Sequence, residues 1–324
     1  MLGQAGHVLT RQAGVRQKRP VTWRTWLGRL APWVVTAVAI TVILRKYPLE
    51  QIVAEMAKGD TLLMLPLALG LTFSILVLVA YWDYLCINGF LGRPRYSDCL
   101  RGKAGMSILQ TLGYGFAHGG YAVWIARLTG ATIGETAGVA LYITASDLCA
   151  LSTVATVTIW FGSAEVPRAL ELIPPIIAGW LYVSVLLGPF QLFGGKLPMV
   201  FQPWARLSRT RQLANILGRV FNISLSVAGT WVAAETFGLG IPLDVMGTYL
   251  PLILFVGSLP INVAGFGPVQ GAWLLFEPWA SGAAILAFEF LWHLMIGGGF
   301  VLRGLPFIRR VVTEIAEGRA QANR

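Results

Sequence analysis

Three titratable side chains stand inside long apolar stretches of the sequence, where a charge is costly. Glu289 lies near the middle of the stretch 279–302, and His293 follows it by four residues, which places both on one face of a helix. Asp147 lies near the middle of the stretch 136–161. A charged residue at the centre of a membrane helix costs about 2.5–3.5 kcal/mol on insertion scales, so it is expected to have a partner or a function. We expect Glu289 and Asp147 to bind a cationic group or to exchange protons, with His293 tuning Glu289; the alternative is that they only pack helices together.

Polar residues also lie in two apolar stretches that glycine and proline interrupt. His118 lies in the first interruption, and Asn262 and Gln270 lie in the second. A helix that breaks within a membrane frees backbone groups that line a cavity, where headgroups or ions can bind. We expect these three side chains to supply hydrogen bonds to a ligand; the alternative is that they satisfy the freed backbone, with Asn262 as a helix cap. The residues expected to form the hinges are Gly115, Gly119, Gly120, Pro260, Gly265 and Gly267.

The sequence carries no signature of a metal-dependent or nucleotide-driven enzyme. It has three histidines and three cysteines, and none of them pair at the spacing of zinc ligands. Cys86, Cys99 and Cys149 are far apart in apolar surroundings, as expected of small buried side chains. No glycine-rich loop followed by Lys and Ser or Thr is present, so ATP drive by this chain is not expected. We expect no metal, no cofactor and no catalytic residue.

The composition predicts that most of the surface faces lipid. Of the 324 residues, 56% are hydrophobic and 12% are charged, whereas a soluble domain carries about 25% charged residues. The long Leu, Val, Ala and Ile runs do not alternate, which favours helices over a barrel. The net charge of +10 comes from basic residues that flank the apolar stretches, so it indicates membrane orientation and contact with anionic lipid rather than nucleic acid.

The expected fold class is therefore an all-α polytopic integral membrane protein. Its apolar segments are 30–44, 61–82, 104–125, 136–161, 172–190, 217–238, 245–276 and 279–302. They form a transmembrane domain at 30–303, between a basic tail at 1–29 and a cytoplasmic C-terminal tail at 304–324. The first tail has six arginine or lysine residues and no acidic residue, so we expect it to be disordered and cytoplasmic. A cleaved signal peptide and an organellar transit peptide are the alternatives.

Basic loops set the expected topology and create a parity conflict. The loops at 93–103 and 196–211 and the C-terminus are basic, so the positive-inside rule places each of them in the cytoplasm. Three apolar segments separate each consecutive pair of these anchors, and three full crossings cannot connect two points on one side. One segment of each trio must enter and leave on one face, and the interrupted segments 104–125 and 245–276 are the candidates.

The prediction is thus about six full spans plus two re-entrant broken-helix segments. One re-entrant segment would dip from the inside and the other from the outside, in halves of opposite orientation. This is the pattern of an inverted repeat, in which a binding site forms where the broken helices meet.

Three arginines lie near the expected membrane ends. Arg127, Arg219 and Arg303 are predicted to be snorkelling anchors, whose charged heads reach the interface. Contact with phosphate is the alternative role. Glu277 is expected near the outer boundary, in contact with water.

The stretch 258–270 reads SLPINVAGFGPVQ and resembles a known family. It is similar to the transmembrane region of lysylphosphatidylglycerol synthases, also called the flippase-like domain family. In that family a Leu-Pro segment precedes a glycine-rich stretch that ends in Gly-x-Gly and then a glutamate; here Gln270 takes the glutamate position, which leaves the role of that carboxylate open. The stretch 111–137 resembles the first-half motif, with Gly119-Gly120-Tyr121 in place of its Gly-Glu pair. Asp147 matches the acidic position of the next helix.

The resemblance covers most of residues 30–310 and implies translocation or binding of a phospholipid or related polar lipid. The family's best understood activity is movement of an aminoacylated phospholipid between leaflets, by a membrane domain fused to a synthase. This chain ends at residue 324, so we expect a separate enzyme to make the lipid. The expected partners are membrane lipids, and the expected location is a bacterial inner membrane with both termini in the cytoplasm.

Two other classes of function stay open at this point. One is an intramembrane enzyme, or an accessory subunit of a lipid-linked glycan or hopanoid pathway, in which Glu289 and His293 would form an acid/base pair. The other is a membrane scaffold, in which neither Glu289 nor Asp147 would matter to function.

Overall fold

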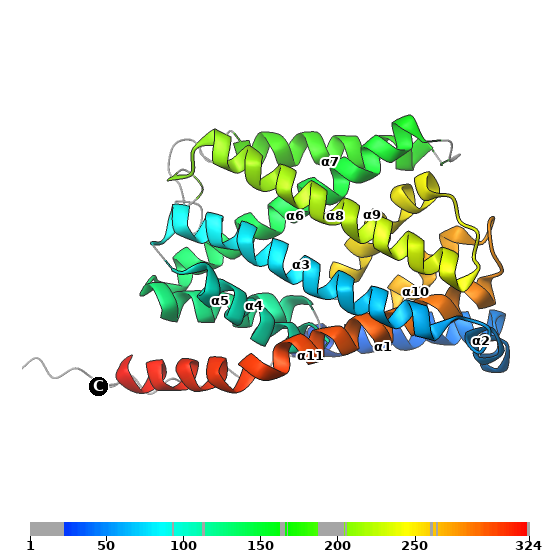
Figure 1. Ribbon diagram of the computed structural model, residues 1–324, viewed down its shortest axis with the longest axis horizontal. Helices are drawn as coiled ribbons and strands as arrows, with labels where there is room; N and C mark the ends of the chain where they lie inside the picture. Colours follow the sequence, from blue (N-terminus) through cyan, green and yellow to red (C-terminus); the bar gives the residue numbers. More distant parts are fainter. Residues whose placement is uncertain are drawn as a thin grey trace, which may run out of the picture.

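The protein is a bundle of long helices (Figure 1). The computed structural model describes residues 23–92, 94–111, 114–162, 166, 168–186, 204, 206–259, 262–263 and 265–322. Their helices are α1 Trp23–Lys46, α2 Leu49–Met56, α3 Thr61–Phe90, α4 Tyr96–Gln110, α5 Tyr114–Thr129, α6 Ile133–Phe161, α7 Arg168–Leu186, α8 Arg209–Phe237, α9 Leu243–Ser258, α10 Pro268–Trp273, the 3-10 helix η2 Leu274–Phe276 and α11 Gly282–Ala322. Within these ranges there is no β-strand beyond one isolated bridge, between Val263 and Phe266.

Several helices are long and apolar enough to cross a membrane. Within the described residues these are α3, α6, α8 and the part of α11 up to Glu314, and α1 with α2 adds a fifth if that pair, bent by 80°, is one span. Large apolar side chains cover their outer faces: Leu62 on α3 is 84% exposed and Phe161 on α6 is 83% exposed. Such surfaces are stable in lipid and costly in water. The architecture is that of an all-helical membrane protein.

The first interrupted segment forms two antiparallel helices, α4 and α5. A side chain on Gly102 of α4 would collide with Trp124 of α5, and a Cβ on Gly120 would lie 2.6 Å from the Sδ atom of Met106. The later residue of α4, Met106, contacts the earlier residue of α5, Gly120, so the two helices run in opposite directions. Small residues at these positions let the helices pack closely.

The position of this break differs from the sequence prediction. The helix α4 ends at Gln110 and α5 begins at Tyr114, so Gly115, Gly119 and Gly120 lie within α5 rather than in a gap between helices. Gly120 serves close packing against Met106, whereas Gly119 has no neighbour within 4 Å of a Cβ position. The loop predicted at 93–103 is also shorter than expected, because α4 begins at Tyr96.

The second interrupted segment breaks between α9 and α10. Gly265 and Gly267 have φ angles of +78° and +134°, a region that L side chains rarely adopt. Asn262 bridges the gap: its Nδ2 atom donates to the carbonyl of Val256 at 2.6 Å, and its Oδ1 atom accepts from the amide of Val269 at 3.3 Å. The side chain therefore caps both helix ends at once. Pro260, the other expected hinge, lies outside the described residues.

The helix α11 continues beyond the apolar segment predicted for it. It extends to Ala322, so most of the expected C-terminal tail at 304–324 is helical. This part packs against α4: a Cβ on Gly105 would lie 3.0 Å from Val311, and one on Gly304 would lie 2.6 Å from Ile108. The N-terminal residues 1–22, which belong to the expected basic tail, lie outside the described part of the chain.

Candidate functional site

A cavity of about 1340 Å³ lies between the two interrupted segments. Its wall includes residues of α1, α3, α4, α5, α6, α8, α9 and α11. It is lined by seven of the residues predicted from the sequence, which are Glu289, His293, Asp147, His118, Asn262, Gly115 and Gly265. The structure thus brings residues of both interruptions to one volume, although their sequence positions differ by more than a hundred residues.

Glu289 is the buried carboxylate of this cavity. It comes from α11, and only 3% of its surface is exposed. The Nε2 atom of Gln270 donates to its Oε1 atom at 3.0 Å. Within the described residues, Glu289 forms no ion pair. A buried carboxylate without a cation has a strong demand for a proton or a cationic ligand.

Gln270 does not line the cavity, but its side chain holds the carboxylate of Glu289 by a hydrogen bond. Its Oε1 atom accepts from the amide of Gly267 at 2.5 Å, and its Nε2 atom also lies 3.3 Å from the carbonyl oxygen of Gly265. Of the two roles considered for Gln270, the structure shows the bonds to the freed backbone, and the predicted hydrogen bond to a ligand stays a prediction. Gln270 satisfies the backbone of the break, and the break in turn orients its amide toward the carboxylate.

His293 lies against the same break. Its ring packs on that of Phe266, with 4.9 Å between the centroids, and a side chain on Gly265 would collide with it. His293 and Glu289 both face the cavity, one turn apart on α11. Two features therefore require glycine at position 265. Its positive φ angle disfavours other residues, and the imidazole of His293 leaves no room for a side chain.

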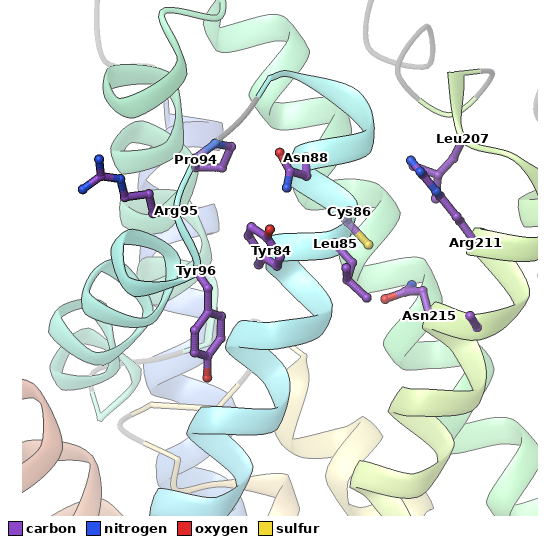
Figure 2. A pocket seen from close by; sticks show the side chains of 11 residues that line it. Tyr84, Leu85, Cys86, Asn88, Pro94, Arg95, Tyr96, Leu207, Arg211 and Asn215 are labelled. Atoms are coloured by element: carbon purple, nitrogen blue, oxygen red, sulfur yellow. The ribbon is translucent and has the colours of Figure 1, made fainter.

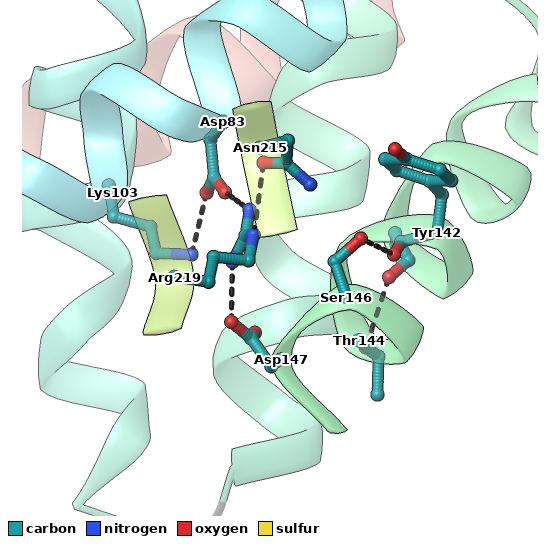
Figure 3. A network of polar contacts seen from close by, with 9 residues as sticks. Asp83, Lys103, Tyr142, Thr144, Ser146, Asp147, Asn215 and Arg219 are labelled. Atoms are coloured by element: carbon teal, nitrogen blue, oxygen red, sulfur yellow. Dashed lines mark hydrogen bonds and ion pairs between the residues drawn. The ribbon is translucent and has the colours of Figure 1, made fainter. Parts of the chain in front are cut away.

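Asp147 belongs to a network of buried charges (Figure 3). Arg219 of α8 donates through Nη1 to Asp147 at 2.5 Å and through Nη2 to Asp83 of α3 at 2.6 Å. Its Nε atom donates to Asn215 at 3.1 Å. Lys103 of α4 completes the chain with a 2.7 Å bond to the second oxygen of Asp83. Two basic and two acidic residues alternate, so their formal charges cancel.

Most of this network was not predicted from the sequence. Arg219 was predicted to be a snorkelling anchor, and this is wrong: the side chain is fully buried and paired with two carboxylates. Asp83 is fully buried and was passed over because it lies one position beyond the apolar segment 61–82. An acid and an arginine inside two long apolar helices could have indicated a pair. Lys103 was assigned to a loop. Lys103 and Asp147 are the two ends of the network that face the cavity.

Three of the remaining predicted residues are placed as follows. His118 of α5 faces the cavity beside Tyr121, whose ring lies 4.9 Å from the Nζ atom of Lys103. Arg303 was also predicted to snorkel, and it is instead buried in the cavity wall. Arg127 is exposed near the end of α5, and its role as an anchor stays a prediction.

A second, smaller pocket of about 760 Å³ lies between the ends of α3, α4 and α8 (Figure 2). Its lining includes Tyr84, Arg95, Tyr96, Arg211 and Asn215. None of the predicted binding or hinge residues lines this pocket. Within the described residues, no group of three or more His, Cys, Asp or Glu side chains is placed to hold a metal ion.

Comparison with known proteins adds nothing to this geometry. No protein-family model matches the chain, and no curated protein was found to be similar to it. The resemblance to the flippase-like family therefore depends on the sequence motifs alone.

Proposed function

We propose that the chain moves a phospholipid or a related polar lipid between the two leaflets of a membrane. The observation that supports this most is the shared cavity, which Glu289, Asp147 and His118 face together. A cavity with a few polar groups in a largely apolar wall suits a polar headgroup. The acyl chains of the lipid would remain in the surrounding bilayer while the headgroup passes through.

The proposed topology has six full spans, α1, α3, α6, α7, α8 and α11, and two re-entrant hairpins. The hairpin α4–α5 would dip from the cytoplasmic side and the pair α9–α10 from the opposite side, as in an inverted repeat. The membrane would be a bacterial inner membrane, with both termini in the cytoplasm. In this arrangement the cavity lies where the two hairpins approach each other, which is where alternating access requires a binding site.

Glu289 is the residue to which we assign the main role. Asp147 is already paired with Arg219, whereas the carboxylate of Glu289 accepts a hydrogen bond from a neutral amide. A cationic group of the lipid headgroup, or a proton, would therefore bind more favourably at Glu289 than at Asp147. His293 and His118 would supply hydrogen bonds, and a separate enzyme would make the lipid.

The proposal is tested by flipping of a fluorescent phospholipid in proteoliposomes. The informative variant is Glu289→Gln, because it removes the charge and keeps the oxygen that accepts from Gln270. Glu277→Gln is the matched control, since it removes a carboxylate at the membrane surface, away from the cavity. We expect wild type and the control to flip the probe and Glu289→Gln to be slower by at least about tenfold, the equivalent of one lost interaction of about 1.4 kcal/mol.

Two results would overturn the proposal. Wild-type protein that does not raise the flipping rate above that of empty vesicles would contradict lipid translocation. Unchanged flipping by Glu289→Gln would remove the assigned role of the carboxylate. Appearance of a chemically altered lipid in the same vesicles would instead favour an intramembrane enzyme.

A further inference from the structure

Arg303 is a buried cation with few partners. It comes from α11, is 94% buried by area (6% exposed), and lines the main cavity. Its Nη1 atom donates to the carbonyl oxygen of Thr72, and its guanidinium carbon lies 4.5 Å from the centre of the Phe300 ring. Its Nε atom is buried and has no hydrogen-bond partner. In the described part of the chain, Arg303 forms no ion pair.

Arg219, the other buried arginine discussed above, has the ion pairs that Arg303 lacks in the described residues. Arg219 is also buried, but it is bonded to two carboxylates and an amide oxygen. A guanidinium has five N–H donors and keeps its charge, so its burial normally requires an anion. One carbonyl and one aromatic face leave most of that demand at Arg303 unmet. Within the described residues, this leaves the guanidinium of Arg303 able to accept an anionic partner.

The surroundings of Arg303 are built from polar backbone and small side chains. Gly299, one turn earlier on α11, lets Thr72 approach closely, because a Cβ there would lie 2.6 Å from the Thr72 hydroxyl. Ser107 of α4 donates to the carbonyl of Phe300 at 2.9 Å. Thr72, Ser107 and Phe300 all line the cavity with Arg303. No carboxylate in this group competes with a ligand for the guanidinium.

Arg303 and Glu289 lie toward opposite ends of one cavity wall. Arg303 follows Glu289 by fourteen residues on α11, or about 21 Å at the rise of a helix. Both side chains are buried, both face the cavity, and neither has an ion-pair partner in the described part of the chain. The wall thus offers one uncompensated cation and one uncompensated anion, separated by most of a bilayer core.

We propose that Arg303 binds the phosphate group of the lipid that enters this cavity. The fork of guanidinium N–H groups matches two oxygens of a phosphate, a geometry that a lysine ammonium does not provide. The substrate class is then a phospholipid rather than a neutral glycolipid. This inference rests on the proposed lipid translocation for its source of phosphate, and a free phosphate ion is the other source of the same chemistry.

The test is binding to the purified full-length protein in detergent. The probes are dioctanoyl phosphatidylglycerol, a dioctanoyl glycolipid that lacks phosphate, and inorganic phosphate. We expect the phospholipid to bind at least about tenfold more tightly than the glycolipid, and Arg303→Met to abolish that preference while glycolipid binding is unchanged. Arg303→Lys should show only part of the wild-type preference for the phospholipid. Lysine keeps the positive charge, but it lacks the paired N–H groups of the guanidinium. Arg127→Met, which changes an exposed arginine, should bind like wild type.

Several outcomes would overturn the inference. A wild-type protein with no preference for the phospholipid would do so without any variant, even if Arg303→Met failed to fold. A preference that survives in Arg303→Met would also contradict it, and displacement of the phospholipid by equal concentrations of inorganic phosphate would assign the site to the free ion. Failure of this inference is separable from failure of the proposed function: flipping of phospholipid and glycolipid at equal rates would reject only the phosphate site, whereas phosphate-selective binding without flipping would reject only translocation.

Discussion

The amide of Gln270 lies 3.0 Å from the carboxylate of Glu289, and this contact joins the broken segment between α9 and α10 to the long helix α11. The same amide group is fixed by Gly265 and Gly267 of the break. The carboxylate that faces the cavity is therefore positioned by the backbone of the interruption. Any movement of the break would be transmitted to the charged end of the cavity through this side chain.

Removal of the Gln270 amide should destabilise the protein. Gln270→Ala leaves the buried amide of Gly267 without its acceptor and takes a donor from Glu289, and an unsatisfied buried polar group costs about 1–3 kcal/mol. We expect a lower Tm in detergent and slower flipping. Gln51→Ala, on the exposed surface of α2, is the control and should melt like wild type. A Gln270→Ala variant with unchanged Tm would show that the break is held by other contacts.

The two buried arginines should respond in opposite ways to loss of charge. Arg219→Met leaves Asp83 buried without its arginine partner, and breaking a buried ion pair costs about 3–5 kcal/mol. Arg303→Met removes a buried cation that has no counter-ion in the described structure, so the ligand-free protein should be at least as stable as wild type. Thermal unfolding of both variants in lipid-free detergent measures the difference. Equal destabilisation of the two would mean that Arg303 also has a structural partner.

Close packing of α3 and α8 depends on glycine. A Cβ on Gly218 would collide with the ring of Trp82, and one on Gly229 would lie 2.9 Å from Leu71. Gly218→Ala should therefore cost about 1–3 kcal/mol through overpacking, although alanine is the better helix former. Gly70→Ala on the open side of α3, where no atom lies within 4 Å, should instead be neutral or stabilising by up to about 1 kcal/mol. The measurement is the Tm of each variant relative to wild type. Equal shifts in Tm for Gly218→Ala and Gly70→Ala would contradict the close contact between Gly218 and Trp82.

The contact between α1 and the loop before α11 should weaken in acid. The Tyr47 hydroxyl donates to Glu277, and the Nζ atom of Lys46 lies 3.0 Å from the same carboxylate. These hydrogen bonds, that of Tyr47 first, lower the pKa of Glu277 below its ordinary value of 4.5. Because the folded pKa is below the unfolded one, the stabilisation is present at neutral pH and disappears as the pH falls through the folded pKa.

This acid dependence is measured as the difference in Tm between wild type and Glu277→Gln. The difference should be small at pH 7, since the pair is at the surface, and should vanish toward pH 3. A difference that stays constant over this range would mean that the charge of Glu277 does not contribute.

The sequence was sufficient to predict the helical membrane class and several of the residues that line the cavity. Glu289 and Asp147 were recognisable because an isolated acid in an apolar stretch is costly wherever the helix is placed. Asn262 and Gln270 were recognisable because proline and glycine interrupt the segment around them. The segment predicted as the span 172–190 contains a shorter apolar helix, α7, with Pro174 and Pro175 inside it.

Other parts of the site could not be read from the chain alone. The sequence predicts interfacial anchors at Arg219 and Arg303, because position along an apolar stretch does not reveal which face a side chain occupies. Pairing of Arg219 with Asp83 depends on how α8 packs against α3, a contact between residues more than 130 positions apart. The glycines of the first interruption were misplaced for a similar reason, since Gly120 is required by the approach of Met106 and not by a break in the helix.

The central claim is that two opposed re-entrant hairpins form one lipid cavity, and thiol accessibility in oriented membranes tests it most directly. Single cysteines would replace Ile133, which is 75% exposed after α5, and Ser281, which is exposed before α11. The background would lack Cys86, Cys99 and Cys149, all of which are buried. We predict that an impermeant reagent labels Ile133→Cys only from the cytoplasmic side and Ser281→Cys only from the opposite side. Labelling of Ile133→Cys from outside would mean that α4–α5 crosses the membrane fully, and it would contradict the opposed hairpins.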